Sequence, residues 1–315
     1  MRSTTAAGSR PPRAPGRRRH ATALFATLVA LLAGCGGGGG ASSKPDLLGV
    51  AFGNGVFVAV ANDGLARVST SGNRDWAEWE VGVPGGLASV AFGAGRFVAV
   101  GDSGAIATSA DGASWEVRSS PTTAGLSGVG HGAGRFVAVG EGGAVLTSVD
   151  GLSWTVRPSG TSANLEAVTR ADDAFWAVGD AGTILRSADG NAWVEVDSGV
   201  DANLNGIAFR APHLVVAGDS GTLLVSRDGE EWELRPTGFE EGFQSAFESQ
   251  GVFVVTGEKG IVITSNDARV WLQQETQTQQ ILNATAWGNG RFVTVGTSSD
   301  GLVSFDAVSW LKIKI

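Results

Sequence analysis

The chain has 315 residues, 43% of them hydrophobic and 17% charged, so it can bury a large core, and this composition excludes an intrinsically disordered protein. Its 48 glycines indicate many turns, and its single cysteine excludes internal disulfides, cysteine metal clusters and thiol redox pairs. Beyond the segment 1–34, 17 basic residues stand against 31 acidic ones, and the resulting net charge of −14 argues against binding to nucleic acid.

The segment 1–34 predicts a secretion signal, because a basic run, "RPPRAPGRRRH", precedes an apolar run, "ATALFATLVALLAG". The apolar run is shorter than the roughly 20 residues that span a bilayer, so no transmembrane helix is expected. The junction that follows, "LAGC", ends at Cys35 and resembles the lipobox of bacterial lipoproteins. That resemblance implies cleavage before Cys35 and acylation of this residue, which would anchor the chain to a membrane. The alternative is an ordinary secretion signal with an incidental cysteine.

Gly36 stands where many lipoproteins of the inner membrane carry an aspartate, so we expect an exported lipoprotein of the cell envelope, at the outer membrane. The run "GGGGGASSKP" cannot pack a core and predicts a flexible tether with a reach of about 20 Å. The predicted organisation is therefore a lipoprotein signal peptide at 1–34, a lipidated cysteine with a Gly-rich tether at 35–46, and one repeat domain at 47–315.

A repeat of about 39 residues organises that domain, and it is marked by tryptophan at 76, 115, 154, 193, 232, 271 and 310. A variant of one turn, such as "SADGASW" at 109–115, leads to each tryptophan. Apolar columns keep the same spacing, and one of them runs through Leu47, Leu87, Leu126, Leu165, Leu204, Phe243 and Leu282.

Each unit divides at its turn signals into four strand-length runs, which in the second unit are LASVAF, RFVAV, AIATS and SWEVR. The second run is apolar on both faces, which predicts a strand between neighbouring sheets. Seven such units predict an all-β fold, a seven-bladed β-propeller of four-stranded antiparallel blades. The blades are expected at about 47–86, 87–125, 126–164, 165–203, 204–242, 243–281 and 282–315.

Ring closure is expected to depend on packing of the seventh blade against the first, because each unit begins with its own inner strand and ends with its own outer strand. An open solenoid is the alternative fold. It is disfavoured because solenoid ends need distinct capping repeats, whereas the terminal units here keep the core columns.

The turn before each tryptophan predicts a structural fastener. Its aspartate is suited to accept backbone N–H groups, its glycine to adopt positive φ, and its tryptophan to bury a large area. In the first unit Ser71 replaces the aspartate, and Ala268 and Ala307 replace the glycine in the last two. The residues concerned are Asp111, Trp115, Asp150, Trp154, Asp189, Trp193, Asp228, Trp232, Asp267, Trp271, Asp306 and Trp310.

These turns resemble the Asp-box of bacterial neuraminidase (BNR) repeats. The combination of "S-x-D-G-x-x-W" with "F-V-A-V-G-D-x-G" is similar to the photosystem II stability and assembly factor family and its relatives in non-photosynthetic bacteria. The resemblance covers 47–315 and implies a docking or assembly propeller without catalysis. The arginine patch of that family cannot be placed on particular residues here, and photosystem assembly itself is not implied.

Sialidases share only the box with this chain. Their catalysis needs a tyrosine nucleophile, and the chain contains no tyrosine. Xyloglucan hydrolases with such boxes usually use two facing propellers, whereas one is predicted here. We therefore expect no enzyme, no cofactor and no metal, the last because His131 and His213 lack ligand spacing.

Two sets of residues are candidates for binding. Carboxylates recur in the turn after the second strand, on the face opposite the boxes, and could bind cations or a basic partner; solvent-facing turn residues are the favoured alternative. At the end of the innermost strand, an aromatic column (Phe52, Phe92, Phe209, Trp287) is interrupted by polar residues, for which solvated strand ends are the favoured alternative. The candidates are Asp102, Glu141, Asp180, Asp219 and Glu258 in the turns, and His131, Arg170 and Glu248 in the column.

The function expected from these observations is a lipid-anchored, non-enzymatic propeller that serves as a docking or assembly scaffold for an unknown protein partner in the cell envelope. The alternative is a carbohydrate-binding or carbohydrate-active propeller. Seven tryptophans belong to the boxes, which leaves Trp79, Trp176 and Trp287 as possible platforms for a glycan.

Overall fold

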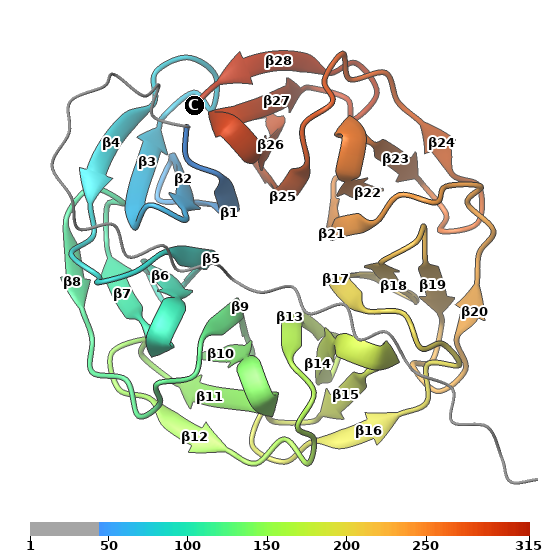
Figure 1. Ribbon diagram of the computed structural model, residues 1–315, viewed down its shortest axis with the longest axis horizontal. Coiled ribbons are helices and arrows are strands. Elements are labelled where there is room, and N and C mark those ends of the chain that lie inside the picture. Colours follow the sequence, from blue (N-terminus) through green and yellow to red (C-terminus); the bar gives the residue numbers. More distant parts are fainter. Residues whose placement is uncertain (1–43) are drawn as a thin grey trace, which may run out of the picture. The chain divides into compact units, whose positions relative to one another are not determined.

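Seven four-stranded antiparallel sheets form the blades of a closed ring around a central opening (Figure 1). The structure is a computed structural model and describes residues 44–315. It confirms the prediction of an all-β, seven-bladed propeller. The predicted signal peptide, Cys35 and the tether up to residue 43 lie outside the described residues. No helix in the described part of the chain is long and apolar enough to cross a membrane.

Each blade uses four consecutive strands, and the first strand of every blade lines the central opening. The bounds are β1 (Leu47–Gly53), β2 (Val56–Ala61), β3 (Leu65–Ser69) and β4 (Ala77–Glu80) in blade 1; β5 (Leu87–Gly93), β6 (Arg96–Gly101), β7 (Ile106–Ser109) and β8 (Trp115–Val117) in blade 2; β9 (Leu126–Gly132), β10 (Arg135–Gly140), β11 (Ala144–Ser148) and β12 (Thr155–Arg157) in blade 3; β13 (Leu165–Ala171), β14 (Ala174–Gly179), β15 (Ile184–Ser187) and β16 (Val194–Val196) in blade 4; β17 (Leu204–Arg210), β18 (His213–Gly218), β19 (Leu223–Ser226) and β20 (Glu233–Leu234) in blade 5; β21 (Phe243–Ser249), β22 (Val252–Gly257), β23 (Val262–Ser265) and β24 (Leu272–Gln273) in blade 6; and β25 (Leu282–Gly288), β26 (Arg291–Gly296), β27 (Asp300–Ser304) and β28 (Leu311–Lys314) in blade 7.

The ring has two faces that differ in the connections they carry. The hairpins between first and second strands share one face with the Asp-box turns, and this is the box face. The opposite face, the turn face, carries the connections between second and third strands. In five blades these are short 3₁₀ turns: η1 (Asp102–Gly104), η2 (Glu141–Gly143), η3 (Asp180–Gly182), η4 (Glu258–Gly260) and η5 (Thr297–Ser299).

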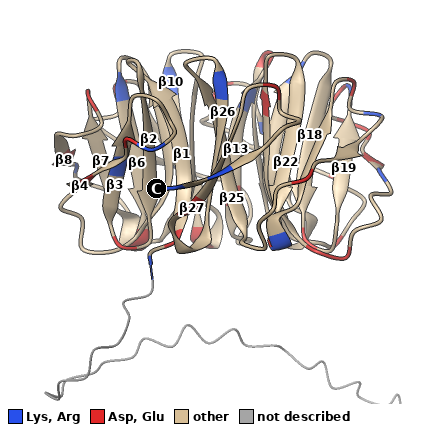
Figure 2. Ribbon diagram, turned by 90° about the horizontal axis from the view of Figure 1, so that it is seen from above, with Lys and Arg blue, Asp and Glu red and all other residues tan. Residues whose placement is uncertain are grey.

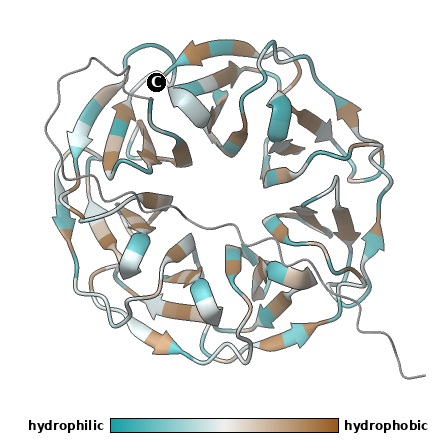
Figure 3. Cartoon of the chain, in the orientation of Figure 1, coloured by the Kyte–Doolittle hydropathy of each residue, from teal (hydrophilic) through white to brown (hydrophobic). Residues whose placement is uncertain are grey.

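The core lies between the blades, and the second strands carry it. In β2, Val58 and Val60 belong to the cluster shared with blade 2, whereas Phe57 and Ala59 belong to the cluster shared with blade 7. All four are fully buried, because successive side chains of a strand point to opposite sides and each side meets a neighbouring blade. Figure 3 shows this as hydrophobic colour on the strands, with mostly hydrophilic or neutral colour on the short turns.

Blade 7 and blade 1 close the ring without exchanging a strand. Val293 and Val295 pack with Phe57 in one buried cluster. On the box face, Asn289 Nδ2 donates to the carbonyl oxygens of Gly55 and Thr70 at 3.2 and 2.7 Å. The expected closure by packing of these two blades is therefore what the structure shows.

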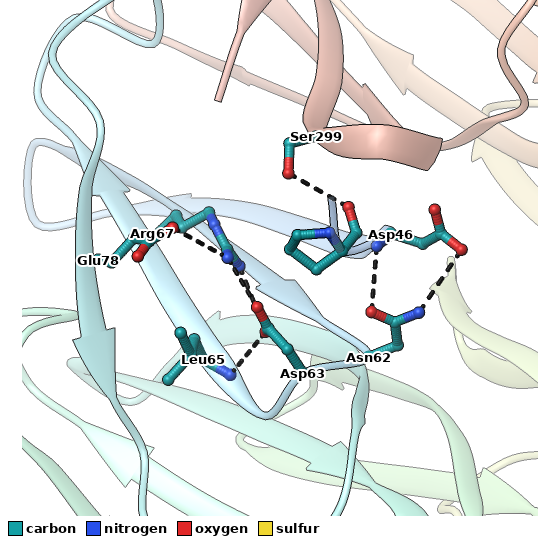
Figure 4. Close-up of polar contacts among 8 residues, drawn as sticks. Asp46, Asn62, Asp63, Leu65, Arg67, Glu78 and Ser299 are labelled. Carbon is teal, nitrogen blue, oxygen red and sulfur yellow. Dashed lines mark hydrogen bonds and ion pairs between the residues drawn. The ribbon is translucent and has the colours of Figure 1, made fainter. Parts of the chain in front are cut away.

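On the turn face, the start of the described chain joins the same two blades. Ser298 N donates to Asp46 Oδ1 at 2.9 Å, and Ser299 N donates to the carbonyl oxygen of Pro45 at 2.9 Å. Asp46 N in turn donates to Asn62 Oδ1 at 3.0 Å (Figure 4). The segment Lys44–Asp46 therefore lies on the turn face, between blades 1 and 7.

A buried arginine beside this junction was not expected from the sequence. Arg67 is only 2% exposed and occupies a position of the third strand that is apolar in the other blades, such as Leu146 in blade 3. Its guanidinium donates to Asp63 at 2.7 Å and to Glu78 at 3.1 Å (Figure 4). These two carboxylates compensate the charge that burial would otherwise leave unpaired.

Replacing Asn289 by Asp removes both hydrogen bonds that this side chain donates to blade 1 and sets a carboxylate against two carbonyl oxygens. We expect the free energy of unfolding to fall by about 1–3 kcal/mol, measured by urea denaturation. Asn54→Asp is the matched control, because Asn54 Nδ2 donates the equivalent pair from blade 1 to blade 2, to Gly95 at 3.5 Å and Ala110 at 2.8 Å. We expect both variants to lose a similar amount of unfolding free energy. A loss in Asn54→Asp without any loss in Asn289→Asp would contradict ring closure through the Asn289 contact.

Candidate functional site

The polar side chains of each Asp-box turn form hydrogen bonds within that turn. In blade 2, Asp111 Oδ1 accepts the backbone N–H groups of Ala113 and Ser114 at 2.8 and 2.7 Å, and Ser109 Oγ accepts that of Gly112 at 2.8 Å. The same aspartate contacts recur at Asp150, Asp189, Asp228, Asp267 and Asp306. The carboxylates are thus used inside their own turns.

The box tryptophans divide into two groups. Trp115 Nε1 donates to the carbonyl oxygen of Gly112 at 2.6 Å, and Trp154, Trp193 and Trp310 make the equivalent bond at 3.1 Å. Trp232 and Trp271 do not, and their buried Nε1 atoms have no partner among the described residues. Blades 5 and 6 therefore depart from the repeat within the box itself.

In the first box, Asp75 supplies the carboxylate that Ser71 lacks, although it does not occupy the repeat position of the other box aspartates. Asp75 accepts hydrogen bonds from the hydroxyls of Ser69, Thr70 and Ser71 and from the N–H of Ser71. Burial raises the pKa of Asp75, but these donors outweigh it and hold the pKa well below the ordinary value of 3.8. The extra residue of the first unit thus makes room for an aspartate that enters the turn from its other end.

The interrupted aromatic column is a packing feature of the box face. In blade 2, Phe92 faces Phe97 across the strand pair with ring centroids 4.8 Å apart, and it covers Gly53 of blade 1, where a Cβ atom would lie only 2.1 Å from the ring. His131 covers Gly93 in the same way, and its ring lies 4.5 Å from that of Phe136. Burial lowers the pKa of His131, whose Nε2 has no partner within the described chain.

Arg170 and Glu248 also occupy this packing position. Arg170 covers Gly132 with its aliphatic stem, places its guanidinium 4.9 Å from the centre of the Phe175 ring, and donates to the carbonyl oxygen of Ala188 at 3.1 Å. Arg170 therefore occupies the column position in the blade next to that of His131, as the sequence predicts. Glu248 lies two blades further on, and its Oε1 accepts the N–H of Gly251 at 3.0 Å.

Arg210 explains why a glutamate is tolerated in the column. It replaces the glycine that the column residue of the next blade would cover, and its guanidinium lies 5.3 Å from the centre of the Phe253 ring. Burial raises the pKa of Glu248, while the N–H of Gly251 and the charge of Arg210 oppose this. Arg210 and Glu248 thus stand where a glycine and an aromatic residue, such as Gly53 and Phe92, meet elsewhere in the ring. This substitution of both partners can be recognised only once it is known which residues face each other between blades.

The turn carboxylates form hydrogen bonds that hold together neighbouring segments of the turn face. Each accepts a hydrogen bond from the residue 16 positions earlier, next to the start of the inner strand: Asp102 from Gly86 N at 2.8 Å, Glu141 from Gly125 N at 2.9 Å, Asp180 and Asp219 from the amides of Asn164 and Asn203 at 3.0 and 3.1 Å, and Glu258 from Gly242 N at 3.3 Å. Asn62 and Thr297 accept the corresponding bond in the remaining blades. The carboxylates therefore lie on one face, spread around the ring rather than gathered at one point.

The central channel contains a residue that sequence reasoning missed. The channel encloses a cavity of about 400 Å³, and Glu166 is the only ionisable side chain among its described lining residues. Burial raises the pKa of Glu166, Asp180 raises it further, and a hydrogen bond from Ser127 opposes the shift. The signal in the sequence is the position after the leucine column, which reads Leu48, Ala88, Ser127, Glu166, Asn205, Gln244 and Asn283.

The chemistry available in the channel is polar recognition. With one titratable group, its lining does not form an acid and base pair for catalysis. No group of three or more His, Cys, Asp or Glu side chains in the described part of the chain could hold a metal ion.

The three tryptophans outside the boxes differ in exposure. Trp79 is 44% exposed on the outer strand β4, whereas Trp176 is 3% exposed. Trp287 is half-buried and packs against Phe292 in a tilted arrangement, with ring centroids 4.5 Å apart. A role in binding glycans would therefore depend chiefly on Trp79.

The two faces of the ring differ in charge. In Figure 2, blue segments lie where β10 and β26 begin, on the box face, where red segments also occur, and red segments outweigh blue ones at the opposite edge. The arginines of the box face are Arg74, Arg96, Arg135, Arg170, Arg210, Arg227, Arg269 and Arg291, which lie in or beside the hairpins and boxes.

No protein-family model and no curated protein matches the sequence. Solved structures do match, and what they share is the propeller class. A YCF48 structure from Cyanidioschyzon merolae has a TM-score of 0.66 at 15% identity, over 87% of this chain and 97% of that chain. A structure of YCF48 bound to D1 peptide has a TM-score of 0.57 at 21% identity, over 70% of this chain and 77% of that chain. The computationally designed protein Ika8 has a TM-score of 0.64 at 14% identity, over 85% and 86%.

At these identities the similarity shows the fold. Both YCF48 structures are propellers, so they agree with the fold that the resemblance of the repeats implies.

The box aspartates predict a loss of stability in acid. Backbone N–H groups of Ser114 and Ala113 lower the pKa of Asp111 to about 2, and the Asn191 side chain does the most to lower that of Asp189 to about 2, from 3.8. Because the folded pKa is depressed, the stabilisation is complete above the ordinary value and is lost as the pH falls toward about 2.

The measurement is the urea midpoint as a function of pH. We expect Asp111→Asn to lower stability at neutral pH by about 0.5–1 kcal/mol, allowing for solvent screening, and to flatten the acid limb of the profile. Asp172→Asn, at an exposed hairpin position, is the control and should leave the profile unchanged. Identical acid limbs in Asp111→Asn and the unmodified protein would contradict this role.

Proposed function

We propose that this protein is a non-catalytic propeller that docks a protein partner on its box face and is held at a membrane by a lipid on Cys35. The observation that carries the docking proposal is a set of exposed arginines whose guanidiniums have no partner among the described residues. The guanidiniums of Arg74, Arg227 and Arg269 are exposed on the box face and make no hydrogen bond or ion pair within the described residues. Arginine is enriched in protein interfaces, and the backbone of a rigid ring loses little conformational entropy on binding.

Similar propellers support protein binding as the function. A YCF48 propeller has been solved bound to D1 peptide, and its fold covers most of this chain. The resemblance of the repeats to the assembly-factor family favours the same general role. The identity of the partner does not follow from this resemblance, because the box motif does not include the residues that would bind it.

The position of Lys44–Asp46 supports the choice of face. This segment is fixed on the turn face by the hydrogen bonds from Ser298 and Ser299. A tether that begins at Cys35 would join the ring there, so the box face is the one left free for a partner. Export to the cell envelope and anchoring at the outer membrane are parts of the same proposal, and they are supported by the "LAGC" junction and by Gly36.

Site-specific photo-crosslinking in cells tests docking. A benzophenone amino acid replaces exposed Ser114 on the box face or exposed Glu240 on the turn face, and adducts are purified and identified. We expect one reproducible protein adduct from position 114 and none from position 240. Adducts from position 240 alone would reverse the choice of face, and repeated absence of adducts from both positions would contradict protein docking.

Cys35→Ser tests the anchor, because it removes the acylated thiol and leaves every described residue unchanged. We expect the protein to move from the membrane fraction to the soluble fraction on cell fractionation. Gly36→Ser is the matched control, since it keeps the cysteine and should keep the protein at the membrane. Unchanged fractionation of Cys35→Ser would exclude lipidation as the means of attachment without bearing on docking.

A further inference from the structure

A cavity beside the Asp-box recurs in the repeat. In blade 3 it encloses about 310 Å³ and is lined by Arg135, Thr147, Val149 and Arg157, with Asn191 from the box of blade 4. In blade 5 the equivalent cavity encloses about 450 Å³, and the corresponding residues are His213, Val225, Arg227, Arg235 and, from blade 6, Arg269. Because the same cavity occurs in both blades, the blade 3 cavity shows which residues the repeat normally places there, and the blade 5 cavity can be compared with it.

The first replacement leaves a buried donor of Arg235 without its acceptor. In blades 2 and 3 the corresponding arginine donates through Nε to a threonine, from Arg118 to Thr108 at 2.8 Å and from Arg157 to Thr147 at 3.0 Å. Val225 stands in place of that threonine in blade 5. Arg235 Nε is consequently buried with no partner in the described structure.

The second replacement affects the box tryptophan of the same blade. Val58 lies beneath the box glycine Gly112 in blade 2, but Trp176 lies beneath Gly229 in blade 5. The Trp176 ring meets the Trp232 ring edge-on, with centroids 6.1 Å apart. Trp232, like Trp271 of blade 6, does not form the box bond, and its Nε1 is buried without a partner among the described residues.

The third difference adds cations. Arg227 and Arg269 replace Val149 and Asn191 of the blade 3 cavity, and neither guanidinium has a partner within residues 44–315. Both act on His213: burial lowers its pKa, and the charges of Arg227, Arg269 and Arg210 lower it further, against an opposite effect of Asp267. His213 Nε2 is buried and also lacks a partner in the described chain.

The acidic residues of the cavity do not satisfy these donors. Asp228 Oδ1 accepts the N–H groups of Glu230 and Glu231 at 2.9 and 3.1 Å, and Glu233 is paired with Arg235 NH1 at 2.7 Å. The side chain of Glu231 is exposed. The cavity therefore combines two exposed guanidiniums that have no protein partner with buried nitrogen atoms that have none either. A buried N–H group without an acceptor costs free energy, and an oxygen atom from a ligand or from solvent would remove that cost.

We propose that the blade 5 cavity is a binding site for an oxyanion, with Arg227 and Arg269 as its charged contacts and Arg235, Trp232 and His213 as further donors. Guanidinium groups bind carboxylate, sulfate and phosphate oxygens through paired, charge-assisted hydrogen bonds. The anion can be free or part of a larger partner, and the chemistry recognised is the same. The inference does not require the proposed docking function, because it depends only on the residues of this cavity.

The test is titration of the isotope-labelled protein with sodium sulfate, inorganic phosphate and acetate at low ionic strength, followed through the indole N–H resonances. We expect saturable shifts of the Trp232 resonance, assigned by its loss in Trp232→Phe, with the Trp115 resonance nearly unmoved. The bound anion should also raise the pKa of His213, measured by NMR, and leave that of His131 unchanged. A stronger response to sulfate and phosphate than to acetate would point to a tetrahedral ligand, and the reverse to a carboxylate.

Arg227→Gln and Arg269→Gln should each weaken binding about tenfold while the protein remains folded by tryptophan fluorescence. Arg74→Gln is the matched control, because Arg74 is an exposed box arginine outside the cavity and its loss should leave the affinity unchanged. Chloride shifting Trp232 as much as sulfate does, no saturable shift with any of the three anions, or equal effects of all three substitutions would each overturn the proposal.

Discussion

The second strand of each blade is buried on both faces, and the rest of the structure depends on that constraint. In β6, the side chains of Phe97, Val98, Ala99 and Val100 are fully buried, two against one neighbouring blade and two against the other. A single blade cannot bury such a strand, and an open row of blades would leave two faces exposed at its ends. Closing seven blades into a ring removes those ends, which is why blades 1 and 7 can meet without a shared sheet or a capping repeat.

Polar groups in this ring serve mainly to hold neighbouring segments together. The box aspartates bind their own turns, the turn carboxylates bind the segment before the inner strand, and Asn54 and Asn289 bind the next blade. A position where the repeats disagree is therefore not evidence of function by itself. Glu248 departs from the column and is matched by Arg210, and Ser71 is matched by Asp75. In the cavity of blade 5, by contrast, the replacements remove acceptors and add donors, and nothing within the described residues compensates.

Both proposed roles place binding on the box face. The turn face carries the regular carboxylates, each used in a hydrogen bond, and the start of the described chain. The box face carries the arginines, several of which pack on phenylalanines, such as Arg170 on Phe175 of its own blade and Arg210 on Phe253 of the next blade. An arginine that stacks on a phenylalanine is held in place for packing, whereas Arg227 and Arg269 remain available to a ligand or partner.

The sequence alone determined the blade number, the strands of each blade and the burial of the second strand on both faces, because these follow from a local pattern repeated seven times. It also located the boxes and the carboxylate turns, and it correctly placed His131 and Arg170 in neighbouring blades. Only the tertiary structure decided how these residues are used. Contacts within irregular turns or between neighbouring blades decide the roles of the remaining residues. They are Asp75 in the first box, Arg210 and its effect on Glu248, Glu166 in the channel, and the unpartnered donors around Arg227. Periodicity predicts that two blades are neighbours, but which side chains fill the space between them is settled by packing.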